Sequence, residues 1–251
     1  MEKLYLTIDQ GNSTAKMSLR SDDAVIASAV AEKVTPDAVA AFTGGRRLNG
    51  IIIASVAGYD AGLAESLRTV ADNVIELTPF TPVPIGIDYT SQSTLGVDRI
   101  AAAVGACAIF PGRDIAVVDA GTAITIDYVD ASGRFRGGNI APGLDMQLQA
   151  LHRFTARLPL VTAPAAPGGN PAVYGTDTPE AILSGCLMSM AGAVEYFRAN
   201  AAPGANAMAV VVTGGNGPHI IPYLSHREDV VAEPHLVDNG LYRILRYNEN
   251  I

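Results

Sequence analysis

The chain has 251 residues, with 17 basic and 25 acidic side chains and a formal net charge of −8. Hydrophobic residues make up 49% of it and charged residues 17%, which predicts a globular protein with a large core and excludes a disordered chain. The acidic balance argues against a nucleic-acid partner, and no apolar stretch reaches the roughly 20 residues of a membrane span. The first ten residues alternate like a strand and lack a signal-peptide core, so we expect a cytoplasmic protein.

Short hydrophobic runs alternate with helical patterns along the first part of the chain. The sequence predicts strands at 3–8, 15–19, 24–30, 51–53 and 74–77, a short helix capped by Thr35, and a helix over 59–71. The following stretch, 78–93, contains three prolines and has no periodicity, which indicates a loop between two halves.

The second part of the chain repeats this alternation. We expect a strand at 115–118, a hairpin of 124–129 with 134–140, a strand at 207–212, and helices at 95–110, 144–154, 179–200 and 236–246. The prediction is therefore an α/β fold with halves at residues 1–93 and 94–251, with the boundary and any exchange of helices left open.

An internal echo connects the two halves. A predicted strand ends in Asp9-x-Gly11, and 110 residues later another ends in Asp119-x-Gly121. Such an echo is expected from a duplicated half-domain, although Asp-x-Gly is short enough to recur by chance.

The turns after these strands carry groups suited to phosphate. Glycine lets a phosphate approach the backbone N–H groups, and hydroxyls and an ammonium add donors and charge. The donors of the first turn are Gly11, Asn12, Ser13, Thr14 and Lys16, and those of the second are Gly121 and Thr122. Asp9 would repel phosphate directly, so we expect it to hold Mg²⁺ through water. The alternative for the first turn is an ordinary hairpin with an exposed lysine.

Asp98 and Arg99 stand at the start of a predicted helix. A carboxylate beside a guanidinium can accept a hydroxyl proton while the guanidinium holds an anionic group. The alternative is an aspartate favoured by the helix dipole, followed by a solvated arginine.

The ordered set of motifs resembles the type III pantothenate kinases, which belong to the superfamily of actin, sugar kinases and heat-shock-chaperone ATPases. The matching segments are DQGNSTAK (9–16), LGVDR (95–99), DAGTAITIDYVD (119–130), GGNIAPGL (137–144), RLP (157–159), TPEAILSG (178–185) and TGG (213–215). They follow the family's order over nearly the whole chain.

The resemblance implies a duplicated ribonuclease-H-like fold, with ATP in a cleft between the halves, and a homodimer. It implies phosphorylation of pantothenate at its primary hydroxyl to 4'-phosphopantothenate, the first step of coenzyme A synthesis, with Mg²⁺ accompanying ATP. By the resemblance, Asp98 is the general base and Asp119 binds a monovalent cation, potassium or ammonium. The implied pantothenate contacts are Gly96, Val97, Arg99, Tyr89 and Thr178, and the implied ATP contacts are Asp9, Gln10, Gly11, Asn12, Ser13, Thr14, Lys16, Gly121 and Thr122.

Two departures from the family pattern stand out. Gln10 replaces the usual apolar residue between Asp9 and Gly11, and Tyr89 is followed by Thr-Ser-Gln-Ser where the family often has a proline. The competing interpretations are a kinase of the same superfamily for a sugar or another small alcohol, and a nucleotide-binding regulator without catalytic activity.

Overall fold

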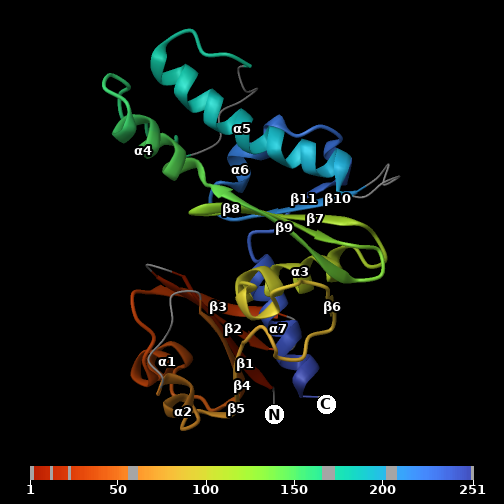
Figure 1. Cartoon of the computed structure of the whole chain (residues 1–251). Helices are drawn as coiled ribbons and strands as arrows, with labels where there is room; N and C mark the ends of the chain where they lie inside the picture. Colours follow the sequence, from red (N-terminus) through yellow and green to blue (C-terminus); the bar gives the residue numbers. More distant parts are fainter. Residues whose placement is uncertain are drawn as a thin grey trace. The chain divides into compact units, whose positions relative to one another are not determined.

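The computed structural model describes residues 3–11, 14–21, 24–55, 62–165, 173–201 and 208–249. The chain forms two compact units, one of Met1–Ala108 with Leu236–Ile251 and the other of Ile109–His235. We call them unit 1 and unit 2, and each contains one sheet with helices packed on it (Figure 1).

Unit 1 is built on a five-stranded sheet in the order β3-β2-β1-β4-β5. Strands β1, β2 and β3 form an antiparallel meander, and β4 and β5 continue the sheet parallel to β1. The strands are β1 (Leu4–Gln10), β2 (Ala15–Ser21), β3 (Ala24–Ala31), β4 (Leu48–Ser55) and β5 (Ala71–Glu76), and β6 (Gly86–Ile87) is a short strand in the segment that follows. The helices are α1 (Pro36–Thr43), α2 (Leu63–Leu67), η1 (Gln92–Thr94), α3 (Val97–Ile109) and α7 (Leu236–Asn248).

Unit 2 repeats this arrangement with strands in the order β9-β8-β7-β10-β11. Here too the first three strands are antiparallel and the last two run parallel to the central strand β7. The elements are β7 (Ile115–Ala120), β8 (Ala123–Val129), β9 (Arg134–Pro142), α4 (Leu144–Phe154), α5 (Thr178–Asn200), β10 (Ala209–Thr213), α6 (Gly217–Ile220), η2 (Ile221–Tyr223), η3 (Arg227–Asp229) and β11 (Val230–Ala232). The shared topology confirms the predicted duplicated ribonuclease-H-like fold.

Each sheet is closed by helices on a hydrophobic face. In unit 1, Leu6 and Ile53 of neighbouring strands belong to a core that includes Val39 of α1 and Leu67 of α2. The prediction of Thr35 as N-cap is confirmed, because its side chain accepts a hydrogen bond from the N–H of Ala38 at 3.2 Å. In unit 2, helices α4 and α5 cover the equivalent face of the second sheet.

The predicted helix over 59–71 is shorter in the structure. Residues 56–61 lie outside the described part of the chain, and α2 ends at Leu67. The chain leaves the helix there because the carbonyl of Val70 accepts a hydrogen bond from the N–H of Leu48 at 2.9 Å, and Ala71 then pairs with Leu48 as the start of β5. Sheet pairing therefore overrides helix propensity at this point.

The compact units differ in extent from the halves 1–93 and 94–251. Helices α3 and α7 belong to unit 1, and α7 packs on β1 and β4. The proline-containing stretch is also tied to unit 1, since Gln92 donates to the carbonyl of Pro79 at 2.7 Å and Asn248 donates to that of Pro82 at 2.9 Å. The chain crosses to unit 2 only at the end of α3.

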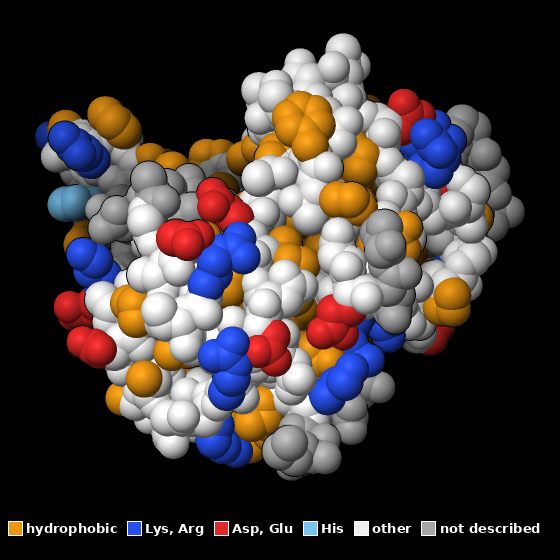
Figure 2. Space-filling view, turned by 90° about the horizontal axis from the view of Figure 1, so that it is seen from below, with side chains coloured by type: hydrophobic (Ala, Val, Ile, Leu, Met, Phe, Trp, Pro, Cys, Tyr) orange, Lys and Arg blue, Asp and Glu red, His pale blue; other side chains and the backbone are white. Residues whose placement is uncertain are grey.

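Within the described residues, none of the helices has the length and apolarity needed to cross a bilayer. On the face shown in Figure 2, the described Lys and Arg side chains lie among Asp and Glu side chains rather than in one large basic patch.

Candidate active site

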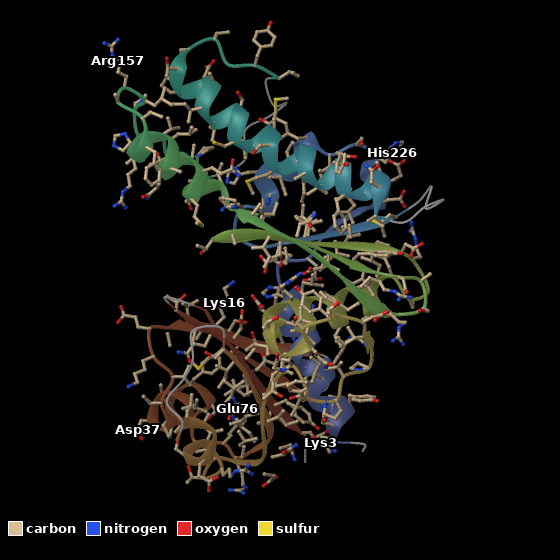
Figure 3. All side chains as sticks on the ribbon, in the orientation of Figure 1. Lys3, Lys16, Asp37, Glu76, Arg157 and His226 are labelled. Carbon is tan, nitrogen blue, oxygen red and sulfur yellow. The ribbon has the colours of Figure 1, made fainter. Side chains whose placement is uncertain are left out.

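The end of the β1–β2 hairpin carries the first set of predicted phosphate-binding residues. Asp9 and Lys16 are directly paired across the two strands, and the N–H of Gly11 donates to the carbonyl of Thr14 at 3.0 Å. Gln10 is the last residue of β1, while Asn12 and Ser13 lie outside the described residues. Lys16 is labelled on β2 in Figure 3.

The carboxyl group of Asp9 is in an environment that opposes its ionisation. Burial raises the pKa of Asp9 to about 6, the charge on Lys16 acts in the opposite direction, and the charges on Asp98 and Asp238 raise the pKa further. Asp9 therefore lies close enough to two other carboxylates to interact with them, in a place where a bound cation would favour the ionised forms.

Asp98 is held at the first turn of α3 by its neighbours in the sequence. Its Oδ1 atom accepts a hydrogen bond from the N–H of Arg99 at 2.9 Å. A Cβ on Gly96 would overlap this same oxygen, so glycine at that position leaves the carboxylate room to fold back. The LGVDR motif thus fixes the orientation of one carboxylate.

Arg99 is not solvated as the alternative interpretation assumed. It is only 6% exposed, and its guanidinium carbon lies 5.8 Å from the centre of the Tyr89 ring. Val97 is buried beside it. The structure therefore brings Tyr89, Arg99 and Asp98 together within unit 1, although the sequence departs from the family pattern after Tyr89.

In unit 2, Asp119 lies near the end of β7 and the turn to β8 follows it. The N–H of Gly121 donates to the carbonyl of Ala123 at 3.0 Å, as Gly11 does to Thr14 in unit 1. Thr122 stands at the tip of this turn. The two halves of the duplicated fold thus end their central strands in equivalent glycine-containing turns.

The loop after β10 packs against Asp119. Gly214 has a φ of +84°, and a Cβ added to it would lie 2.5 Å from Oδ1 of Asp119. The N–H of Asn216 donates to the carbonyl of Ala120 at 2.9 Å. The carboxylate, the adjoining backbone carbonyls and the hydroxyl of Thr122 are the oxygen ligands that hard cations prefer, so this donor set fits a cation of that kind.

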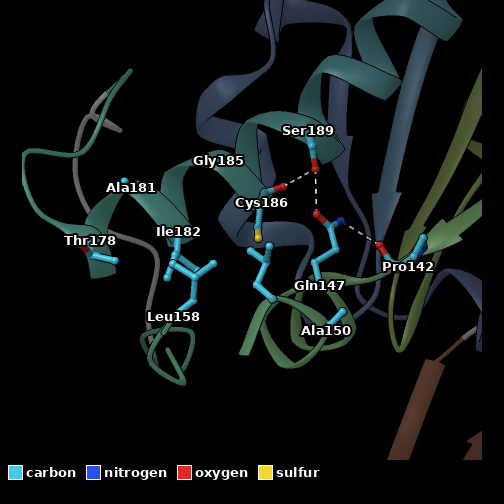
Figure 4. A pocket seen from close by; sticks show the side chains of 11 residues that line it. Pro142, Gln147, Ala150, Leu158, Thr178, Ala181, Ile182, Gly185, Cys186 and Ser189 are labelled. Carbon is cyan, nitrogen blue, oxygen red and sulfur yellow. Dashed lines mark hydrogen bonds between the residues drawn. The ribbon is translucent and has the colours of Figure 1, made fainter. Parts of the chain in front are cut away.

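Thr178 lines a pocket of about 600 Å³ between α4 and α5 (Figure 4). The lining is mostly apolar and includes Leu158 and Ile182. Its polar part is a hydrogen-bonded chain in which Ser189 donates to Gln147 at 2.8 Å and Gln147 donates to the carbonyl of Pro142 at 2.8 Å.

The sequence did not predict a role for three further residues of unit 1, namely Thr7, Arg20 and Asp238. Asp238 of α7 accepts hydrogen bonds from the hydroxyl of Thr7 and from the guanidinium of Arg20. The available signal was a single arginine within the apolar strand pattern at 15–21, because a buried arginine requires a partner.

The described residues contain no group of three His, Cys, Asp or Glu side chains arranged to hold a metal ion. Mg²⁺ that arrives with ATP needs only one or two protein carboxylates, because phosphate oxygens and water complete its coordination. Asp9, partly buried and within electrostatic range of Asp98 and Asp238, fits that requirement.

The duplicated fold, with its paired aspartate-bearing turns, belongs to the fold class of the actin-like ATPases and sugar kinases. A Sinorhizobium meliloti protein described as a 2-dehydro-3-deoxygalactonokinase is similar, with a TM-score of 0.63 at 18% identity over 98% of this chain and 100% of that chain. The ADPNP-bound activator of the 2-hydroxyisocaproyl-CoA dehydratase from Clostridium difficile is also similar, with a TM-score of 0.56 at 13% identity over 98% and 96% of the two chains.

Within this class, residues 5–200 match the model of the family described as type III pantothenate kinase. The type III pantothenate kinase of Porphyromonas gingivalis W83 is 35% identical over 97% of this chain and 98% of its own length. That of Bacteroides fragilis ATCC 25285 is 36% identical over 98% of both chains. The chain belongs to the type III pantothenate kinase family, whose activity implies ATP together with a divalent metal ion.

Proposed function

We propose that this chain transfers the γ-phosphoryl group of ATP to the primary hydroxyl of pantothenate, giving 4'-phosphopantothenate and ADP. The observation that carries the proposal is the electrostatic coupling of Asp98 to Asp9 in unit 1: burial raises the pKa of Asp9 to about 6, and the charge on Asp98 adds to that rise. A carboxylate able to accept a proton thus lies within electrostatic range of the turn that is suited to hold phosphate and magnesium.

In the proposed reaction, the substrate hydroxyl oxygen attacks the γ-phosphorus and the bond from that phosphorus to the β,γ-bridging oxygen breaks. ADP leaves with the electron pair of the broken bond, and Asp98 takes the hydroxyl proton. Phosphoryl transfer depends mainly on positioning and charge neutralisation, and a positioned base adds a factor of about 10² to 10⁴.

The substrate contacts follow from the surroundings of Asp98. The buried guanidinium of Arg99, stacked near Tyr89, is suited to the carboxylate of pantothenate. Gly96 and Val97 directly precede the base, and their backbone is suited to contact the substrate. Thr178, with its mostly apolar pocket, is suited to a further contact with the extended substrate.

For ATP, the first turn supplies Gln10, Gly11, Asn12, Ser13 and Thr14, together with Lys16 as a point charge. The second turn supplies Gly121 and Thr122. Asp9 would hold Mg²⁺ through water and Asp119 would bind potassium or ammonium, and these cations would supply positive charge to offset that of the phosphates. A homodimer is part of the proposal, and the described apolar side chains exposed on α4 and α5, including Met146, Phe154 and Tyr196, support it.

The experiment measures ADP release with saturating ATP and a panel of acceptors that contains pantothenate, sugars and small alcohols. We expect pantothenate alone to stimulate release and 4'-phosphopantothenate to be the product. Stimulation by a sugar instead would favour another kinase of the same class. No stimulation by any acceptor, with intact ATP binding, would favour the non-catalytic regulator.

A further inference from the structure

One face of the β1–β2 hairpin leads from the proposed phosphate turn to the interior of unit 1. Alternate residues of a strand point to the same face, and pairing across the hairpin joins them in rows. From the turn inwards the paired rows are Asp9 with Lys16, Thr7 with Ser18, and Tyr5 with Arg20. The two inner rows therefore lie directly behind the carboxylate and the ammonium of the proposed site.

Helix α7 packs on β1 and fastens these inner rows to itself. Asp238 accepts from the hydroxyl of Thr7 on β1 and forms an ion pair with Nη1 of Arg20 on β2. Nη2 of Arg20 donates to the side-chain oxygen of Asn239 at 2.8 Å. One carboxylate thus joins both strands of the hairpin to a single helix.

Burial makes the contacts of Asp238 with Thr7 and Arg20 resistant to displacement. Thr7 is 2% exposed and Arg20 is 4% exposed. A buried ion pair with additional hydrogen bonds tolerates little displacement, because moving one partner leaves a charge without compensation. Thr7 precedes Asp9 by two residues, about 7 Å along a strand. A shift of the inner rows is therefore transmitted to the turn.

We propose that Asp238 is a positioning residue for phosphoryl transfer: by holding Thr7 and Arg20, it sets the place of Asp9 and Lys16 and thereby the affinity for Mg²⁺–ATP. The inference rests on the proposed function, because it takes Asp9 and Lys16 as the groups that meet the nucleotide. It assigns a functional role to the C-terminal helix, which carries none of the recognised motifs.

The test compares Asp238→Asn with Glu249→Gln, one residue past the end of the same helix. Glu249 accepts from the hydroxyl of Tyr5 at 3.1 Å and pairs with Arg246, but it lies eleven residues further along, about 16 Å from Asp238. For Asp238→Asn we expect the KM for ATP to rise by about 10- to 100-fold, since misplacement by about 1 Å has effects of that size, while the KM for pantothenate stays within twofold. Glu249→Gln should leave both KM values unchanged.

A purely structural role would lower the melting temperature and the active fraction without changing the KM values of the folded enzyme. That result, or an equal rise in both KM values, would overturn the proposal. An equal effect of Glu249→Gln on the KM for ATP would overturn it as well, because the effect would then belong to helix docking in general.

A second pair of variants covers the case in which Asp238→Asn fails to fold. Thr7→Val removes the hydroxyl at nearly constant volume, and Thr7→Ser keeps it. We expect a raised KM for ATP in the first and recovery in the second, and equal KM values would contradict the proposal. Titration of the same variants with Mg²⁺–ADP separates this inference from the proposed function, because weakened nucleotide binding would support the positioning role even if pantothenate were not the acceptor.

Discussion

Asp98→Asn is the most direct perturbation of the proposed chemistry, because it removes the proton acceptor and changes little else. Asparagine has the same shape, and its side-chain oxygen can keep the hydrogen bond that Asp98 accepts from the N–H of Arg99 at 2.9 Å. The lost favourable interaction of the charge with the N-terminus of α3 costs only about 0.3–1 kcal/mol. The variant should therefore fold and bind ATP.

The turnover number of Asp98→Asn should fall by orders of magnitude, whereas its free energy of unfolding should change little. A general base contributes a factor of about 10² to 10⁴, equivalent to about 3–5 kcal/mol of activation free energy. The assay measures kcat from pantothenate-dependent ADP release, beside a separate ATP titration. Asp37→Asn is the matched control, since Asp37 also lies in the first turn of a helix but is well separated from Lys16 in Figure 3. Turnover of Asp98→Asn within tenfold of the unmodified enzyme would remove Asp98 from the role of base.

Three further predictions concern the proposed cation site, the carboxyl group of Asp9 and the packing of α3. Activity should require potassium or ammonium and Asp119→Asn should abolish that requirement together with most activity; full turnover in sodium alone would contradict the cation site. In the unliganded chain, Asp9 with its pKa of about 6 holds its proton more tightly when folded than when unfolded, so the free energy of unfolding should fall by about 3 kcal/mol as pH rises from 4 to above 6. Asp9→Asn should remove that fall in urea titrations, and an unchanged pH profile would refute the assignment. Gly240→Ala should lower the free energy of unfolding, measured in urea, by about 1–3 kcal/mol and should also lower kcat. The added Cβ would overlap the carbonyl oxygen of Ala101 and push α3, which carries Asp98, away from α7. Unchanged stability would argue against this close contact between the two helices.

The sequence predicted those parts of the fold that depend on local pattern. The apolar run at Ile51–Ile53 is a fully buried strand, and the hairpin after Asp119 forms as β8 and β9. The helix over 59–71 was predicted too long, because its C-terminal part pairs with Leu48, and such a contact is not visible in local periodicity. The assignment of α3 and α7 to unit 1 likewise depends on tertiary packing.

The candidate site likewise contains residues that have a local sequence signal and a residue that has none. Asp9 and Asp98 carry local signals, namely a glycine turn after a strand and an Asp-Arg pair at a helix start. Asp238 carries none, since its contact with Arg20 joins residues 218 positions apart. The roles of Asp98 as base and of the cleft between the units as the ATP site stay predictions.

The C-terminal helix explains how three carboxylates from distant parts of the sequence come together. Helix α7 bonds to the hairpin that carries Asp9, crosses the helix that carries Asp98, and contributes Asp238 itself. Its inward side chains, fully buried, are Leu236, Leu241, Ile244 and Leu245. At about 1.5–3 kcal/mol for each buried side chain, they contribute about 6–12 kcal/mol, which is comparable with the whole stability of a typical domain. The duplicated fold accounts for the two similar sheets, but unit 1 can present Asp9 of β1 and Asp98 of α3 to one substrate only when the last helix of the chain has packed against both elements.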